Sequence, residues 1–166
     1  MQKRYFPLAI AVLVLITVAC LCTGTDQLTP TSVPQQEPQQ EPSQSTVPDV
    51  QSSGIITEVV MARDTEGIEL EPVDPTTVFS PDSVIHAVVR IEDAPSNTEF
   101  AAAFYVVDVG DAAEPDTLIS SNTLTADGTR NVEFTLTPTT SWPAGTYRVE
   151  ISVNGTLDQV VQYTVQ

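Results

Sequence analysis

From residue 54 to the C-terminus, apolar and polar residues alternate in short runs separated by turn residues. Seven runs stand out, at residues 55–63, 84–91, 100–107, 117–125, 132–137, 146–153 and 160–165. Alternation with a period of two is typical of strands with one buried face, and no useful length of this region has a helical period. The pattern therefore predicts an all-β fold, a single seven-stranded antiparallel β-sandwich over residues 54–166.

The alternation also predicts which side chains face the core. In three runs the apolar set occupies every second position, namely Ile85, Ala87, Val89 and Ile91, then Phe100, Ala102, Phe104 and Val106, then Tyr147, Val149, Ile151 and Val153. Neighbouring positions along a strand point to opposite faces of the sheet. His86, which lies between two members of the first set, is therefore expected on the outer face.

The last two runs are joined by Asn154-Gly155, a pair typical of two-residue hairpin turns. A simple two-residue turn would oppose Val149 to Val160 and would put the apolar residues of the last run outside. A shift of one residue reverses every face. We therefore expect an odd-length loop or a bulge, which opposes Val149 to Val161.

The segment before this hairpin carries a family resemblance. Trp142-Pro143-Ala144-Gly145 leads into the strand, Gly145 offers freedom in φ, and Tyr147 stands where a tyrosine corner would anchor the strand. The sequence Trp-Pro-Ala-Gly-Thr-Tyr-Arg-Val-Glu-Ile, followed by Asn-Gly and Tyr-Thr-Val, resembles the last hairpin of immunoglobulin-like domains in bacterial lipoproteins. The resemblance implies an immunoglobulin-like sandwich. It departs from antibody-type domains in lacking a cysteine pair and in having Phe104 in place of their tryptophan.

The N-terminus has the layout of an export signal. Lys3 and Arg4 precede an uncharged apolar run over residues 7–19, which ends at Cys20. Residues 16–20, Ile-Thr-Val-Ala-Cys, resemble the lipobox of bacterial lipoproteins, in which the cysteine is acylated and the chain is cut just before it. The resemblance implies that residues 1–19 are a lipoprotein signal peptide and that Cys20 is the lipidation site and membrane anchor.

An uncleaved transmembrane anchor is the alternative, because no charge interrupts residues 5–25 and about 17–25 apolar residues span a bilayer. Either arrangement leaves the positive end inside and the remainder of the chain outside the cytoplasm. We therefore expect a membrane-anchored protein of the bacterial cell envelope.

Residues 20–53 combine the expected lipidated cysteine with a Pro/Gln-rich stretch. The unit Gln-Gln-Glu-Pro occurs twice in it, and residues 23–53 contain no Phe, Trp or Tyr. So little apolar surface does not offset the entropy of ordering. We expect a disordered tether between the membrane and the domain.

Charge narrows the possible partners. The chain has 22 acidic and six basic residues and a net charge of −16, which disfavours binding to nucleic acid. The two cysteines, Cys20 and Cys22, both precede the domain, so a disulfide within it is not expected.

Candidate chemistry is sparse. His86 is the one histidine, and neither a nucleophile elbow nor a glycine-rich phosphate loop is present, so no catalytic residue, cofactor or metal site is predicted. The residues nearest to a metal site are four acids between the third and fourth runs, whose oxygens are of the type that Ca²⁺ prefers: Asp108, Asp111, Glu114 and Asp116.

These observations favour a non-enzymatic lipid-anchored protein. Its immunoglobulin-like domain would serve as a binding or structural module for an unknown protein or envelope partner. Two alternatives remain open from the sequence. One is a proteinase-inhibitor-like or regulatory domain, and the other is a calcium-binding or enzyme-accessory domain.

Overall fold

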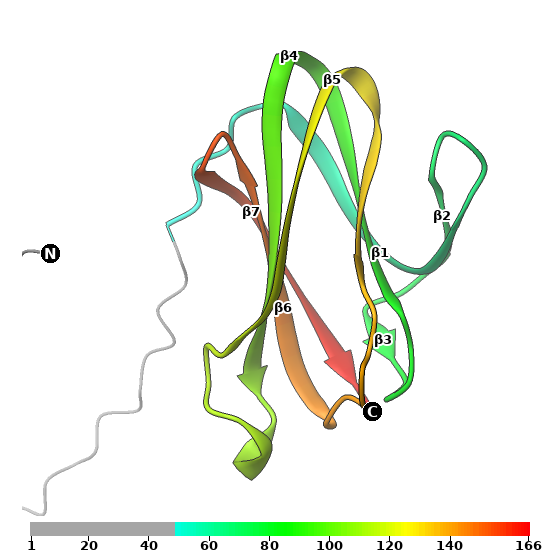
Figure 1. The fold of residues 1–166 in the computed structure, drawn as a ribbon, viewed down its shortest axis with the longest axis vertical. Helices are drawn as coiled ribbons and strands as arrows, with labels where there is room; N and C mark the ends of the chain where they lie inside the picture. Colours follow the sequence, from blue (N-terminus) through cyan, green and yellow to red (C-terminus); the bar gives the residue numbers. More distant parts are fainter. Residues whose placement is uncertain (1–48) are drawn as a thin grey trace, which may run out of the picture. The chain divides into compact units, whose positions relative to one another are not determined.

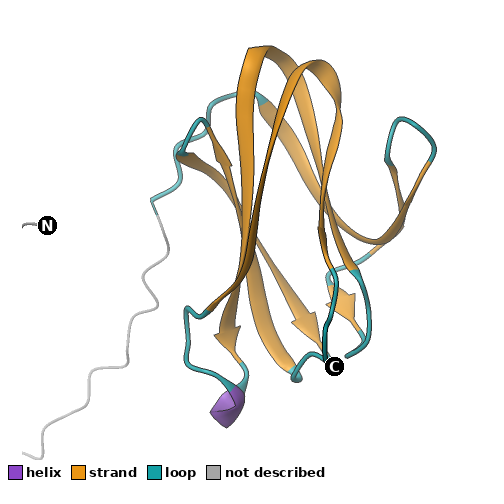
Figure 2. Cartoon of the chain, in the orientation of Figure 1, coloured by secondary structure: helices purple, strands orange, loops and turns teal. Residues whose placement is uncertain are grey.

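The computed structural model describes residues 49–166. The expected signal peptide, Cys20 and most of the tether lie outside the described residues. Between residues 49 and 166 the regular structure consists of strands and one 3₁₀ turn, η1 at Gly110–Ala112, so the predicted all-β class is confirmed (Figure 2). The strands are β1 (Ile56–Glu66), β2 (Glu71–Pro75), β3 (Val78–Phe79), β4 (Ile85–Asp108), β5 (Leu118–Leu136), β6 (Gly145–Val153) and β7 (Thr156–Val165).

One sheet contains all the strands, and it curls over into two arms that are β-sandwich-like. The sheet order is β2-β1-β4-β6-β7-β3, and β5 pairs with β4. The first half of β4 pairs with β1 and its second half pairs with β6, while β5 follows β4 along both halves. Figure 1 shows the antiparallel pair of β4 and β5 passing over the top of the fold, with one half of the pair on each side. We call the part with β1 and β2 the first arm, and the part with β6, β7 and β3 the second arm.

The bend between the arms corrects the predicted strand limits. Runs expected as separate strands are fused, two into β4 and two into β5. The ladder shifts register twice near Ala94, and Asp93, Asn97 and Gly128 have φ of 48°, 64° and 69°. Bulges bend a strand pair without ending it. Asp, Asn and Gly are also the residues that tolerate positive φ best.

The core fills the space between the two arms. The three predicted inner sets, on both halves of β4 and on β6, are all buried, which confirms them. The second half of β5 adds Val132, Phe134 and Leu136. Because the side chains of both arms form one apolar cluster, burial of this cluster holds the curled sheet closed.

The two ends of the sheet order depart from the prediction. β2 and β3 both lie between the first two predicted runs, where no strand was expected. β3 pairs with β7 in parallel, so the sheet is mixed rather than wholly antiparallel. The link between β2 and β3 reaches both ends of the sheet. The Thr76 N–H donates to the Met61 carbonyl (2.9 Å), and the Thr164 N–H donates to the Thr77 carbonyl (2.8 Å). Thr76 and Thr77 thus connect β1 at one end of the sheet order with β7 at the other.

The β6–β7 hairpin has the predicted pairing. Val149 opposes Val161, and the expected irregularity is a bulge opposite Ile151 and Ser152 rather than a longer loop. The turn itself has two residues, Asn154 and Gly155, with φ of 49° and 80°. An Asn-Gly turn and a buried apolar face are compatible because the bulge absorbs one residue of β7.

The start of β6 is fixed by the predicted tyrosine corner. The Tyr147 hydroxyl donates to the Pro143 carbonyl at 2.6 Å. Gly145 is needed for close approach, because a Cβ there would lie 2.9 Å from the Cα of Val109 and closer still to the Asp108 carbonyl oxygen. Contact with this neighbouring backbone, more than freedom in φ, explains the glycine.

Candidate functional site

The outer face of the first arm is partly covered by the β1–β2 hairpin. The side chain of Asn131 on β5 donates to the carbonyl of Glu69 at 3.0 Å, and the Thr65 hydroxyl donates to Glu133 Oε1 at 3.2 Å. Asn131 and Glu133 flank buried Val132, so their side chains point outward. These contacts hold the hairpin across the outside of the sheet.

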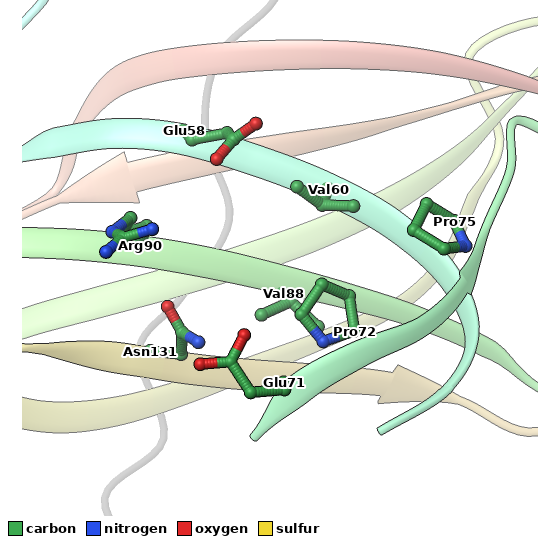
Figure 3. A pocket seen from close by; sticks show the side chains of 8 residues that line it. All are labelled: Glu58, Val60, Glu71, Pro72, Pro75, Val88, Arg90 and Asn131. Atoms are coloured by element: carbon green, nitrogen blue, oxygen red, sulfur yellow. The ribbon is translucent and has the colours of Figure 1, made fainter. Parts of the chain in front are cut away.

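A groove of about 320 Å³ lies between this hairpin and the sheet (Figure 3). Its lining comes from β1, β2, β4 and β5. It consists of Glu58, Val60, Glu71, Pro72, Pro75, Val88, Arg90 and Asn131. Four of these residues are apolar or proline and four are polar or charged. The groove therefore offers an apolar surface beside hydrogen-bonding groups, the usual composition of a ligand site.

The charges around the groove have both signs. Glu58 opposes Arg90 in the β1–β4 ladder, and Glu71 projects from β2. Within residues 49–166 no carboxylate lies within ion-pair distance of the Arg90 guanidinium, whereas Arg130 and Arg148 are both paired. Arg90 can therefore bind a carboxylate of a partner, and Glu58 and Glu71 favour a cationic group beside that carboxylate.

His86 lies next to the groove and has a partner. Its Nδ1 is 2.5 Å from Glu133 Oε1, the same oxygen that accepts from Thr65. His86 is on the outer face, as predicted, but it is half-buried and paired. The two side chains are diagonal neighbours, since Glu133 opposes Val88. Only the strand register could have revealed this contact from the sequence.

The four acids named as the nearest approach to a metal site have other contacts. Asp108 accepts from the Gly110 N–H at 3.0 Å, and Asp116 accepts from Arg148 at 2.5 Å. In the part of the chain that the structure describes, no group of three or more His, Cys, Asp or Glu residues is placed to hold a metal ion. Asp111 and Glu114 are exposed on the turn that contains η1. The structure does not bring these four carboxylates together as a ligand set.

Arg148 stabilises the outer face of the second arm. Its Nε is 2.7 Å from Glu150 Oε1, and its guanidinium carbon lies 4.6 Å from the centre of the Tyr105 ring. With its bond to Asp116, it joins β6 to the turn between β4 and β5. This network fixes the end of the second arm that carries η1.

Asp158 is a buried acid that the sequence pattern did not single out. It occupies the bulge of β7 and has no exposed surface. Its Oδ2 accepts from the Ser53 N–H at 2.5 Å, and its Oδ1 has no hydrogen-bond partner among residues 49–166. The Gln51 N–H donates to the Leu157 carbonyl at 2.9 Å. The folded unit thus begins slightly before the predicted boundary at residue 54.

No family model and no curated protein matches the chain. It is similar in structure to the alkylpurine DNA glycosylase AlkC of Pseudomonas fluorescens bound to DNA containing an abasic site analog (TM-score 0.39, 14% identity, 66% of this chain and 30% of that chain). It is also similar to a β-glucosidase from Listeria innocua in complex with glucose (TM-score 0.37, 14% identity, 65% of this chain and 16% of that chain). A third similar structure is the CARDB domain of the PF1109 protein from Pyrococcus furiosus in complex with di-metal ions (TM-score 0.33, 14% identity, 71% of this chain and 93% of that chain).

The chain spans less than a third of the length of the first two of these structures. Across residues 49–166, no helix is long and apolar enough to cross a membrane.

Proposed function

We propose that the chain is a non-enzymatic, lipid-anchored protein of the bacterial cell envelope whose folded unit is an immunoglobulin-like β-sandwich that binds a partner. Cys20 would carry the lipid, and residues 20–53 would separate the folded unit from the membrane. The likeness of residues 16–20 to a lipobox supports the anchor. Two arms around a common core and the hydrogen bond of the tyrosine corner support the sandwich.

The groove beneath the β1–β2 hairpin is the observation that carries the binding role. A β1–β2 hairpin with no binding role could pack directly against the outer face of the sheet and bury its apolar side chains there, which would leave no groove. Here Asn131 and Glu133 contact the hairpin near its tip, at Glu69 and Thr65, and a groove of about 320 Å³ remains between the hairpin and the sheet. Its volume is within the range of pockets that hold ligands, about 300–1,000 Å³.

The groove is best suited to a segment of a protein. Val60 and the two prolines of β2 offer an apolar contact. Arg90, which has no ion-pair partner among residues 49–166, can bind a carboxylate of the incoming chain. Ile68 at the hairpin tip is 95% exposed and would extend the contact beyond the groove. An apolar side chain next to an acidic one, in an extended segment, is the partner chemistry that these groups favour.

Site-specific photo-crosslinking of the full chain in its native envelope tests this role. A photoreactive residue at Glu58, on the groove, should give a discrete adduct, and the same residue at exposed Thr140 is the control. Adding Arg90→Glu should reduce the adduct from position 58, because the partner carboxylate would lose its cation. Equal adducts from both positions, or an adduct indifferent to Arg90→Glu, would contradict the proposed binding site.

The anchor has a separate test. Metabolic labelling with a radioactive fatty acid should mark the full chain and should be lost in Cys20→Ala but kept in Cys22→Ala. Labelling that survives Cys20→Ala would reject Cys20 as the lipidation site without bearing on the groove.

A further inference from the structure

β5 is an edge strand along its whole length. It has 19 residues, and within residues 49–166 its only strand partner is β4. In the first arm, Asn131 places part of this edge next to the β1–β2 hairpin. In the second arm, the Thr117 hydroxyl donates to the Glu114 carbonyl at 2.6 Å. No other described residue outside β4 hydrogen-bonds to residues 117–126. The outward backbone groups of this stretch are free to pair with another strand.

The other two edges are protected against such pairing. β2 is Glu-Pro-Val-Asp-Pro, in which prolines and acids alternate around one valine. β3 has only two residues and is soon followed by Pro81. Prolines, charges and short length are the usual means by which proteins prevent edge-to-edge association. Because β2 and β3 are both protected in this way, an unprotected stretch of β5 indicates a surface on which another strand can pair.

Residues 117–126 have none of these protections. Their sequence, Thr-Leu-Ile-Ser-Ser-Asn-Thr-Leu-Thr-Ala, contains no charge, proline or glycine in a chain with a net charge of −16. Leu118 is 51% exposed, and Ser121 and Thr123 are also exposed. β-branched residues recur along the stretch and favour extended backbone. This is the surface on which a further strand would be added at the least cost.

We propose that residues 117–126 form a homodimer interface, in which β5 of one copy pairs antiparallel with β5 of a second copy. The two five-stranded second arms would then form one continuous sheet across a two-fold axis. Pairing of identical edges in opposite directions is isologous and therefore closes at two copies. The two-residue β3 ends each outer side of that sheet, which prevents further growth.

Charge favours a second copy over an unlike partner at this edge. A partner selected by the strong negative charge of this chain would be basic, but residues 117–126 offer it no carboxylate. Two copies repel each other everywhere except where uncharged surfaces meet. In the antiparallel pair, uncharged side chains face uncharged side chains, so like charges are not brought into contact across the ladder.

Sedimentation equilibrium of the full chain in detergent, over a range of protein concentrations, tests the proposal. The wild type should show a monomer–dimer equilibrium. The double variant Ser121→Lys with Thr123→Lys should raise the dimer Kd about tenfold or more, because lysines from the two copies face each other across the axis. The matched control, Thr139→Lys with Thr140→Lys, adds the same charge on an exposed loop and should leave the Kd unchanged.

Mixing separates charge repulsion at the edge from damage to the fold. A third variant carries Glu at positions 121 and 123, and an equimolar mixture with the Lys variant should restore dimers, now mixed ones. Contact through the apolar N-terminus is the same in every variant and cannot produce this pattern. A wild type that stays monomeric throughout, a Lys variant that dimerises as tightly as the control, or a mixture that fails to associate would each overturn the proposal.

Discussion

The two tyrosines that pair across the β6–β7 hairpin should respond in opposite ways to the same substitution. Tyr147 and Tyr163 face each other in the ladder, and their rings are stacked at 5.5 Å with an interplanar angle of 12°. Both are almost fully buried. The Tyr147 hydroxyl donates to the Pro143 carbonyl, whereas the Tyr163 hydroxyl has no partner among the described residues.

The hydrogen bonds set the expected magnitudes. A buried polar group without a partner costs about 1–3 kcal/mol, so Tyr163→Phe should raise the free energy of unfolding by about 1 kcal/mol or more. Tyr147→Phe should lower it by about 1 kcal/mol, since it removes one hydrogen bond and leaves the Pro143 carbonyl unpaired. Both variants keep the stacked rings, so the aromatic contact cancels in the comparison. The two variants should therefore differ by about 2 kcal/mol.

Urea unfolding of the full chain measures this difference. Trp142, the one tryptophan, packs against the core and reports its loss by fluorescence. Unchanged slopes with denaturant would show that the substitutions act on stability alone. If Tyr163→Phe destabilised the protein as much as Tyr147→Phe, the Tyr163 hydroxyl would have a partner, such as a bound water, and the reasoning would be wrong.

Alkaline pH gives a second measure of the same pair. Burial raises the pKa of Tyr163 and of Tyr147 above the ordinary tyrosine value of 10.0. Below pH 10 both tyrosines are protonated in the folded and unfolded states, so they give no pH dependence. Above pH 10 the unfolded chain loses protons that the folded chain keeps, and stability falls as the pH rises. Tyr163→Phe should reduce this fall, and an unchanged alkaline slope would contradict the role of burial.

Three further substitutions test the contacts around the groove and the hairpins. Gly145→Ala should lower the free energy of unfolding by about 2–3 kcal/mol through overpacking. The control Gly128→Ala, whose added Cβ meets open space, should lower it less. Equal losses of stability would refute the role of close backbone approach at Gly145. Glu133→Ala should speed hydrogen exchange and proteolysis in the β1–β2 hairpin, since it removes the acceptor of the Thr65 hydroxyl, one of the two contacts that hold the hairpin across the sheet. Asp158→Ala should speed exchange of the Ser53 amide, whereas Asp158→Asn, which keeps an acceptor, should preserve its protection.

The core and the last hairpin could be predicted because each depends on alternation along a single strand. Val149 opposite Val161 follows from the need to bury one apolar face, whatever the turn. The bend of β4 could not be predicted, because Pro95 and Asn97 are typical of loops and here occupy bulges within a continuing ladder. β2 was missed for a related reason, since a strand with two prolines in five residues is possible only at an edge.

The groove could not be predicted because it depends on contacts between distant residues. Asn131 contacts Glu69 across 62 positions of sequence, and His86 contacts Glu133 across 47. Neither pair has a local signature. The free edge of β5 was also hidden, because the sequence divides that strand into two short runs and does not reveal its neighbours.

The described start of the chain allows both proposed surfaces to act at once. Gln51 and Ser53 dock on the bulge of β7. Asn154, at the adjacent turn, pairs with the backbone of Glu99 close to the bend of β4. The first described residues therefore lie on the side of the bend (Figure 1). The groove lies on the first arm and residues 117–126 on the second. If dimerisation and partner binding are independent, Ser121→Lys with Thr123→Lys should leave the adduct from a photoreactive residue at position 58 unchanged. Loss of that adduct in the monomeric variant would show that the partner requires two copies.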